Sequence, residues 1–459
     1  MRQRELTLVE PATVTGRAPP VEDAELAARM AAFRAFEPRP EVAVAVSGGP
    51  DSLALTLLLD RWVRARGGRL HALTLDHGLR PEAAAEAEWL SGQLARFDIA
   101  HTVLTWRPGD PGRVTHAVAR AARYDRLAAW CARRGVLHLA LAHHRDDQAE
   151  TLLARVRMGS GPDGLAGMPA IRHLRDLRLL RPLLDIPKAR LEATLAAMDQ
   201  PWIADPSNAD SRHGRPHLRR LMPDLAQSGM TAANLAAYAD AMGRARARLD
   251  TGRADLAAEA VAVFPEGYAA VMPEPILAAP APLADAVMGR VLRCIGGRDH
   301  MPRGPRLARL MAGLRAEPGR ARTLGGCRIV PWRGQWLIVR EPGRAPRVGV
   351  NAAGTLVYDN RFHMAFDRPQ SGDRAVAPLG MGGWKRLCAL APDLRSSPLP
   401  PAVRPAVPAV FDANGPCAVP HLGWRRAPDG PVVIGCRFAP RRSVAESAFT
   451  VAAAPRHII

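Results

Sequence analysis

From residue 41 onward, short apolar runs that favour β-structure alternate with longer Ala-, Leu- and Arg-rich stretches of helical periodicity. The apolar runs predict strands over 42–46, 70–75, 100–104 and 136–141, and the stretches between them predict helices over 53–66, 81–96 and 115–133. Each predicted helix is long enough to cross back over a sheet, and this alternation is typical of βαβ units. The sequence therefore predicts an α/β, Rossmann-like domain with a parallel sheet over residues 41–225.

The segments that flank this domain have other patterns. Residues 1–40 are expected to form a variable N-terminal lead-in with one short amphipathic helix near 22–36. Residues 226–320 are expected to form a mostly helical domain, and residues 321–459 a small α/β or β-containing C-terminal domain with strands at 327–330 and 336–339. Several domains are expected in any case, because 459 residues exceed what one hydrophobic core usually serves.

The charge of the chain points to a polyanionic partner. The formal net charge is +19, and neutralising phosphates releases counterions, which favours binding of nucleic acid. A compositional bias is the alternative, because nearly all of the basic residues are arginine, and Lys188 and Lys385 are the only lysines. Charge alone therefore favours, without establishing, a nucleic-acid partner.

Other features restrict where the protein works. No apolar run approaches the roughly 20 residues needed to span a bilayer, and the N-terminal residues lack the apolar core of a secretory signal. None of the six cysteines stands in C-x-x-C spacing, so they are interpreted as thiols in a reducing compartment. We therefore expect a cytoplasmic protein without a membrane partner.

A phosphate-binding loop is predicted directly after the first strand. The loop reads Ser47-Gly48-Gly49-Pro50-Asp51-Ser52 and leads into a helix. Glycines let a ligand approach the backbone, and the amides and dipole of a helix start attract anions. The alternative is an ordinary glycine-rich turn with a serine cap. A Walker loop is excluded because no lysine follows a glycine.

A second glycine pattern is weaker evidence for nucleotide binding. Gly159-x-Gly161-x-x-Gly164 formally matches a dinucleotide-binding fingerprint. It follows a predicted helix, whereas the fingerprint requires a preceding strand. We therefore interpret it as a chance match or as a loop of the active site.

The loop at 47–52 resembles the signature of the ATP-pyrophosphatase (PP-loop) superfamily, whose members cleave ATP between the α and β phosphates. Four further segments resemble the tRNA(Ile)-lysidine synthetase family in order and spacing, and together they span roughly residues 40–225. They are Leu75-Asp76-His77-Gly78-Leu79-Arg80, Ala119 to Tyr124, Ala142-His143-His144-Arg145-Asp146-Asp147-Gln148-Ala149-Glu150-Thr151, and Gly159 to Met168. Weaker resemblances occur at 181–184, 202–208 and 324–329.

The resemblance implies a ligase that uses ATP and Mg²⁺ to join free L-lysine to the wobble cytidine of a tRNA(Ile) with a CAU anticodon, and it makes residues 226–320 a tRNA-binding domain. A homodimer is a further possibility. The residues expected to act on the substrates are Asp51, Arg120, Arg123, His143, Asp147 and Glu150. Those expected to bind the nucleotide are Ser47, Gly48, Gly49, Pro50, Asp51, Ser52 and Asp76, and those expected to hold Mg²⁺ are Asp51 and Asp147.

Some of these residues also have plain structural interpretations. Arg120 and Arg123 share a helical face and can both meet phosphates, but paired arginines are also common on solvated faces. Asp147 and Glu150 have the spacing of a helix cap and its third-position acid. One histidine with two carboxylates suits Mg²⁺ on phosphates better than structural zinc.

Two alternative functions and one departure from the family pattern remain. A PP-loop tRNA cytidine thiolase would share the domain but normally carries cysteine pairs, and a non-catalytic RNA-binding protein would need no phosphate loop. Where the family commonly has an Arg-Asn-Arg-like run, this chain has Arg215-Pro216-His217-Leu218-Arg219. RNA contacts by Arg215 and Arg219 therefore stay open.

Overall fold

The computed structural model describes residues 6–11, 18–34, 36–76, 78, 83–107, 115–174, 176–204, 214–302, 304–350, 354–367, 374–427 and 433–451. The chain forms two compact units, one of Met1–Arg248 with Ala448–Ile459 and one of Leu249–Ser447. The boundary falls within helix α9 (Ala232–Ala260), and the chain returns to the first unit after residue 447. This division is coarser than the four segments predicted from the sequence.

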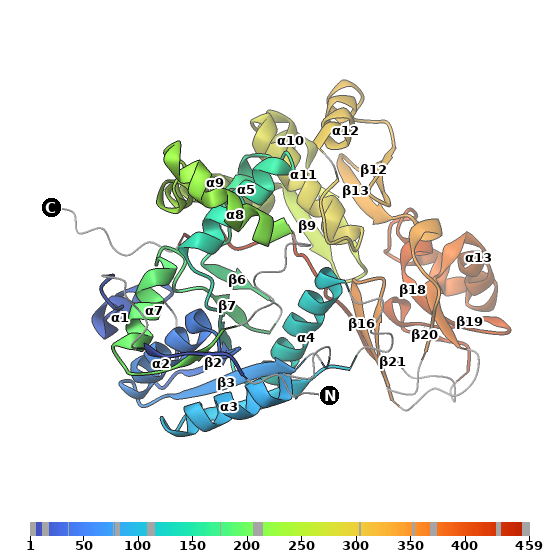
Figure 1. The fold of residues 1–459 in the computed structure, drawn as a ribbon. Coiled ribbons are helices and arrows are strands. Elements are labelled where there is room, and N and C mark those ends of the chain that lie inside the picture. The colour runs from blue at the N-terminus through green and yellow to red at the C-terminus, as the bar shows by residue number, and fades with distance from the viewer. Residues whose placement is uncertain are drawn as a thin grey trace. The chain divides into compact units, whose positions relative to one another are not determined.

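A six-stranded sheet forms the centre of the first unit (Figure 1). Its order is β4-β3-β2-β5-β7-β6, with β6 antiparallel to β7 and the other pairs parallel. The strands are β2 (Glu41–Ala45), β3 (Arg69–Asp76), β4 (Ala100–Thr105), β5 (His138–Ala140), β6 (Ile171–His173) and β7 (Arg178–Leu180). The four predicted parallel strands are confirmed with slightly shifted ends, and the three-residue strands β6 and β7 were not predicted.

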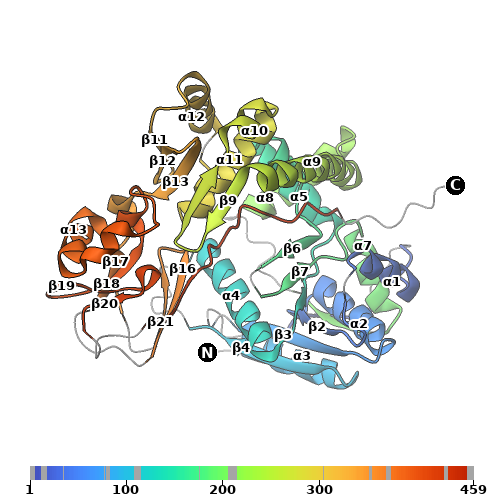
Figure 2. The ribbon, with the colours of Figure 1, turned by 180° about the vertical axis from the view of Figure 1, so that it is seen from behind.

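Helices cover both faces of this sheet (Figure 2 shows it from behind). They are α1 (Asp23–Ala32), α2 (Pro50–Arg64), α3 (Ala83–Ala95), α4 (His116–Arg134) and α7 (Lys188–Ala196). Val42 and Val44 share a core with α1, α2, α3 and α7, whereas Ala43 and Ala45 pack with Leu127 of α4. Alternate residues of β2 thus face opposite layers, and the α/β, parallel-sheet fold class is confirmed.

The remaining elements of the first unit surround the sheet. Helix α5 (Arg145–Arg157) follows β5, and the short α6 (Pro162–Leu165) and α8 (Gly214–Gln227) come later. Strand β1 (Leu8–Val9) pairs with β8 (Trp202–Ile203). Leu26 and Met30 of α1 are fully buried in the core, so this part of the lead-in packs as part of the first unit.

The second unit begins with a helical region that contains a β-hairpin. Helices α10 (Pro273–Ala278), α11 (Ala281–Ile295) and α12 (Gly304–Ala316) agree with the prediction, but β9 (Val261–Phe264) and β10 (Tyr268–Val271) correct it. These strands complete an antiparallel sheet of order β11-β12-β13-β10-β9 with β11 (Arg322–Leu324), β12 (Cys327–Trp332) and β13 (Gln335–Arg340). β10 pairs with its neighbour β9 and also with β13, a partner far along the chain.

The end of the second unit is rich in short strands, as predicted. One sheet contains β14 (Val348–Gly349), β17 (Ala375–Pro378), β18 (Pro408–Asp412), β19 (Gly415–Val419) and β20 (Trp424–Arg425), and another contains β15 (Thr355–Tyr358), β16 (Phe362–Phe366) and β21 (Val433–Phe438). Helix α13 (Gly380–Leu390) lies between β17 and β18 in the chain. None of the described helices combines the length and apolarity needed to cross a membrane.

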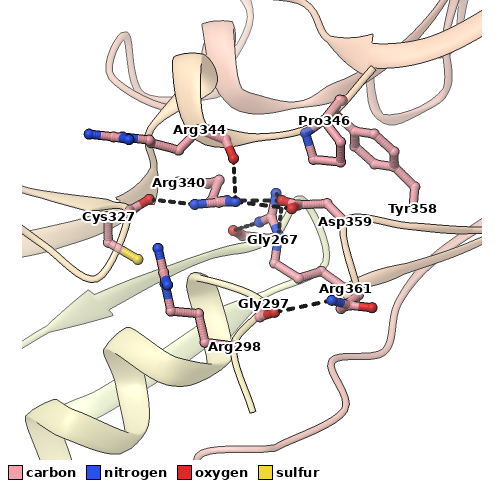
Figure 3. A network of polar contacts seen from close by, with 12 residues as sticks. Gly267, Gly297, Arg298, Cys327, Arg340, Arg344, Pro346, Tyr358, Asp359 and Arg361 are labelled. Carbon is pink, nitrogen blue, oxygen red and sulfur yellow. Dashed lines mark hydrogen bonds and ion pairs between the residues drawn. The ribbon is translucent and has the colours of Figure 1, made fainter. Parts of the chain in front are cut away.

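A buried ion-pair network connects β13 with the turn between β15 and β16 within the second unit (Figure 3). The turn between β15 and β16 presents Asp359, whose carboxylate accepts from Arg340 Nε at 2.9 Å and Nη2 at 3.0 Å and from Arg361 Nε at 2.9 Å. Arg340 also donates to the carbonyl of Gly326 at 3.0 Å. All three charged side chains are at most 7% exposed. One carboxylate therefore stabilises two buried guanidinium groups.

We expect Asp359→Asn to destabilise the second unit by about 3–5 kcal/mol, because it leaves two buried cations without a counter-charge. The matched control is Asp299→Asn, since Asp299 forms a 3.8 Å ion pair with Arg441 in which both side chains are more than half exposed. That exposed pair should contribute at most about 1 kcal/mol. Urea unfolding followed by tryptophan fluorescence measures both; equal effects would contradict the proposed importance of the network.

Candidate active site

A large cavity of about 1580 Å³ lies in the first unit at the carboxyl ends of β2, β3 and β5. Strand order reverses between β2 and β5, and open α/β sheets bind ligands at such a point. Every site residue predicted from the sequence lines this cavity except Gly48. The lining residues are Ser47, Gly49, Pro50, Asp51, Ser52, Asp76, Arg120, Arg123, His143, Asp147 and Glu150, among others.

The predicted phosphate loop is held in shape by Ser52. The Ser52 hydroxyl accepts from the backbone amide of Ser47 at 3.1 Å and donates to the carbonyl of Gly49 at 3.1 Å. Helix α2 begins at Pro50, and its N-cap Gly49 supplies no side-chain hydrogen bond. Ser52 therefore stabilises the turn through these two hydrogen bonds. The N-terminus of the helix has no side-chain cap that would compete with an anion for its backbone amides.

Gly48 supports the loop from behind. Its φ of +80° is a conformation that glycine adopts readily, and a Cβ there would lie 2.5 Å from Cδ1 of Ile203. The Gly48 carbonyl accepts from the backbone amide of Ile203 at 2.9 Å. The residue predicted to bind nucleotide thus positions the loop against β8 and does not line the cavity.

Four carboxylates line the cavity near the start of α5, and we call them the acidic wall: Asp51, Asp146, Asp147 and Glu150. His144 is 5% exposed, and its Nε2 lies 3.5 Å from carboxylate oxygens of both Asp51 and Asp147. Its Nδ1 lies 3.3 Å from Asp146. Burial lowers the pKa of His144, but hydrogen bonds to Asp146 and Asp51 and the charges of Asp147 and Asp51 outweigh it and raise the pKa to about 10. The neighbouring carboxylates therefore favour the protonated form of His144.

Sequence reasoning selected His143 and missed His144 and Asp146. Both histidines line the cavity, and the carboxylates of Asp51 and Asp146 lie within 3.5 Å of the His144 ring. The available signal was the helix start: His144 is the N-cap of α5, and its backbone amide donates to Asp147 at 3.0 Å. The alternative role of Asp147 as a helix cap, with Glu150 as its third-position acid, is therefore not observed. Helix α5 begins at Arg145, so the cap is His144 and the third-position acid is Asp147.

Glu150 is held by an arginine from another helix. It is 3% exposed, and Arg219 Nε of α8 contacts its Oε1 at 2.5 Å. The Nη2 atom of Arg219 lies 3.8 Å from Asp147. Arg219, whose RNA contact the sequence left open, therefore forms ion pairs with two residues of the acidic wall. The side chain of Arg215 lies outside the described residues.

A basic wall is formed by α4. Arg120 and Arg123 both line the cavity, and Arg120 Nη2 donates to the hydroxyl of Tyr124 at 3.0 Å. Arg123 is half-buried, and desolvation lowers its pKa. Arg123 is therefore not freely solvated, whereas Arg120 is exposed.

Asp76 closes the end of β3. Its carboxylate accepts from the amide of Gly78 at 2.7 Å and from Arg107 Nη2 at 3.0 Å. It lines the cavity as predicted. Two neighbouring parts of the family resemblance, His77 with 79–80 and the stretch 205–208, lie outside the described residues.

The glycine-rich segment after α5 is clamped by that helix. The Gln148 amide exchanges hydrogen bonds with the backbone of Met168 at 2.7 and 3.0 Å, and Arg155 Nη1 donates to the carbonyls of Gly164 and Gly167 at 2.5 and 2.6 Å. Because the segment follows a helix, it is not a dinucleotide fingerprint. Neither Gly159, Gly161 nor Gly164 lines the cavity.

The acidic wall fits a magnesium ion bound together with phosphates. Asp51 Oδ1 is buried and has no hydrogen-bond partner among the described residues. In the part of the chain that the structure describes, no three His, Cys, Asp or Glu side chains form a self-sufficient metal cluster. Mg²⁺ is usually held by one or two carboxylates and by substrate phosphates, so Asp51 and Asp147 match that requirement.

Comparison with known proteins agrees with this location. Residues 23–225 match the PP-loop domain family. The tRNA(Ile)-lysidine synthase of Methylobacterium nodulans is 40% identical over 353 residues, which are 72% of this chain and 99% of that protein. The enzyme of the same name from Ruegeria pomeroyi is 36% identical over 393 residues, 86% of this chain and 91% of that protein.

A third relative is more similar over a shorter stretch. The tRNA(Ile)-lysidine synthase of Rhodopseudomonas palustris is 48% identical over 220 residues, 48% of this chain and 64% of that protein. The Methylobacterium match, by contrast, extends over nearly the whole of the relative. On this evidence the chain belongs to the tRNA(Ile)-lysidine synthase family.

Proposed function

We propose that this chain is an ATP-dependent tRNA(Ile)-lysidine synthase that acts in the cytoplasm. Its substrates would be ATP, free L-lysine and a tRNA(Ile) with a CAU anticodon, and its products lysidine-containing tRNA, AMP and pyrophosphate. The observation that carries the proposal is one cavity with a phosphate loop, an acidic wall and a basic wall. Each substrate carries a charge that one of these surfaces complements.

The first half-reaction activates the wobble cytidine. Its C2 oxygen attacks the α-phosphate of ATP, a P–O bond forms, and pyrophosphate leaves with the electron pair of the broken bond. The loop at 47–52 would bind the phosphates, and Arg120 and Arg123 would hold phosphate of ATP or RNA. Mg²⁺, held by Asp51 and Asp147, would supply charge stabilisation when bound.

The second half-reaction brings a cation to the acidic wall. The ε-ammonium of lysine is attracted by carboxylates, loses one proton, and its amine then attacks C2 and displaces AMP. Asp147 and Glu150 line the cavity and can attract the ammonium and accept its proton. Arg219 fixes the orientation of Glu150 through their ion pair.

The two alternative functions are less well supported. A cytidine thiolase would require reactive sulfur, but no cysteine is among the residues that line the described cavity, and burial raises the pKa of Cys131 to about 12. A non-catalytic RNA-binding protein would have no use for four carboxylates around a phosphate loop. A homodimer stays part of the proposal and is tested by light scattering.

Replacing Asp51 by alanine should abolish most pyrophosphate release, with a loss of about a hundredfold in rate, because the carboxylate is useful beside phosphate only when a metal ion accompanies it. Pyrophosphate release is measured with tRNA, ATP and Mg²⁺, and circular dichroism checks the fold. Asp125→Ala, an exposed acid on α4, is the control. Near-normal turnover of Asp51→Ala at saturating Mg²⁺ would sink the assignment.

The double variant Arg120→Ala/Arg123→Ala should raise KM for ATP or tRNA at least about tenfold, because each charge-assisted contact contributes roughly 1.5–3 kcal/mol. Steady-state kinetics with each substrate varied in turn identifies which phosphate is bound. Arg126→Ala/Arg133→Ala removes two exposed arginines from the same helix outside the cavity. If both double variants behave alike, the α4 arginines form only a basic surface.

Glu150→Gln should impair lysine transfer more than adenylation, because glutamine keeps the size of the side chain but loses its charge and basicity. Rapid-quench assays with labelled ATP and tRNA should show AMP-modified tRNA accumulating in the presence of lysine. Glu88→Gln, at an exposed position of α3, is the control. Equal loss of both steps would show that Glu150 serves ATP, Mg²⁺ or the structure of α5 instead.

A further inference from the structure

Two guanidinium groups interact with the Tyr124 hydroxyl in the part of the chain that the structure describes. Arg120 Nη2 donates to this hydroxyl at 3.0 Å, and the Arg120 guanidinium stands 5.1 Å from the centre of the Tyr124 ring. The side chain of Arg181 makes a second polar contact with Tyr124. Tyr124 itself lines the cavity. Its oxygen therefore lies at the basic wall, between two cations.

Arg181 is a buried cation without a nearby acid. It is 3% exposed, follows directly after β7, and its Nη1 donates to the carbonyl of Pro169 at 2.7 Å. Desolvation lowers its pKa, and the neighbouring charges of Arg172 and Arg120 act in the same direction. Among the described residues, no carboxylate forms an ion pair with Arg120, Arg123 or Arg181. Burying such a charge is costly unless an anion compensates it.

The chemistry of the two side-chain types fixes the direction of the hydrogen bonds. A guanidinium has donors and no acceptor, whereas a phenol has one O–H donor and two acceptor lone pairs. Tyr124 can therefore only accept from Arg120 and Arg181. Its own proton cannot be given to either of them, so it remains for an acceptor in the cavity.

We propose that Tyr124 donates its hydroxyl proton to a phosphate oxygen in the cavity, and that Arg181 is the positioning residue that orients this hydroxyl. A phosphate fits better than a neutral acceptor, because only an anion also compensates Arg120, Arg123 and Arg181. This assignment refines the proposed function by adding a phosphate contact on the basic wall, and it leaves ATP and the RNA backbone as the two sources of that phosphate.

The backbone explains how Arg181 holds its place. Its amide donates to the carbonyl of Ala170 at 2.8 Å, and its side chain reaches Pro169 in the same segment. Two anchors on one short stretch fix the guanidinium relative to the sheet. This gives a physical role to the Arg-Pro-Leu-Leu segment at 181–184, for which the proposed reaction has no other use.

The test compares Tyr124→Phe with the unchanged protein. Phenylalanine keeps the ring beneath Arg120 and removes only the hydroxyl. Isothermal titration calorimetry with inorganic pyrophosphate, with a non-hydrolysable ATP analogue and with tRNA measures each phosphate source separately. We expect about tenfold weaker binding of at least one of the three, as for loss of a hydrogen bond to a charged group. Unchanged affinity for all three would overturn the proposal.

Arg181→Lys tests the positioning role. Lysine keeps the charge but cannot reach Pro169 and Tyr124 with one planar group, so binding should weaken in the same direction as in Tyr124→Phe. The double variant should bind no more weakly than Tyr124→Phe alone, because Arg181 acts through the hydroxyl. Additive losses, measured on protein whose thermal unfolding shows it to be folded, would overturn the role of Arg181.

Tyr358→Phe is the matched control, because its hydroxyl donates to the backbone carbonyl of Pro346 at 3.1 Å in the second unit. It should lower the melting temperature and leave pyrophosphate affinity unchanged. The pyrophosphate titration needs neither lysine nor tRNA. If wild-type protein binds pyrophosphate through Tyr124 but incorporates no lysine, the proposed function fails and the phosphate contact stands. If lysine is incorporated and Tyr124→Phe binds pyrophosphate, the ATP analogue and tRNA normally, the proposed function stands and the phosphate contact fails.

Discussion

The reversal of strand order between β2 and β5 is the constraint on which the site depends. Chains leaving these two parallel neighbours turn toward opposite faces of the sheet, and the gap between them receives the phosphate loop from β2 and the start of α5 from β5. Asp51 and Asp147 are distant in sequence, yet both reach the imidazole of His144. The acidic wall is therefore a product of topology, and each member needs the other strand in place.

The acidic and basic side chains that line the cavity lie on different walls. On the acidic wall, Asp51, Asp146, Asp147 and Glu150 outnumber the cations His144 and Arg219. On α4 and after β7, Arg120, Arg123 and Arg181 form no ion pair with a carboxylate among the described residues, and two of them, Arg120 and Arg181, interact with the Tyr124 hydroxyl. Such a division suits a reaction whose substrates are a polyphosphate, a polynucleotide and an amine, because each can bind without neutralising the wall that attracts the next.

The sequence was informative where local pattern determines structure. Strand–loop–helix periodicity located β2 and the loop at 47–52, and helical spacing placed Arg120 and Arg123 on one face. It failed where a long-range partner decides. Adding His144 to the site requires knowing where Asp51 lies, and Glu150 pairs with Arg219, a residue 69 positions away in the chain.

Two cationic side chains of the chain lie against the carboxylates of the acidic wall. His144 and Arg219 compensate part of the charge of these carboxylates through their ion pairs. Mg²⁺ or an ammonium group that binds there must share Asp51, Asp147 or Glu150 with His144 and Arg219. Its binding is therefore less favourable than binding to carboxylates without a cationic partner. On the basic wall no such competitor is present among the described residues, and a phosphate gains the full attraction of the arginines. The two walls therefore differ: a phosphate meets arginines that have no acidic partner among the described residues, whereas a cation must share its carboxylates with His144 and Arg219.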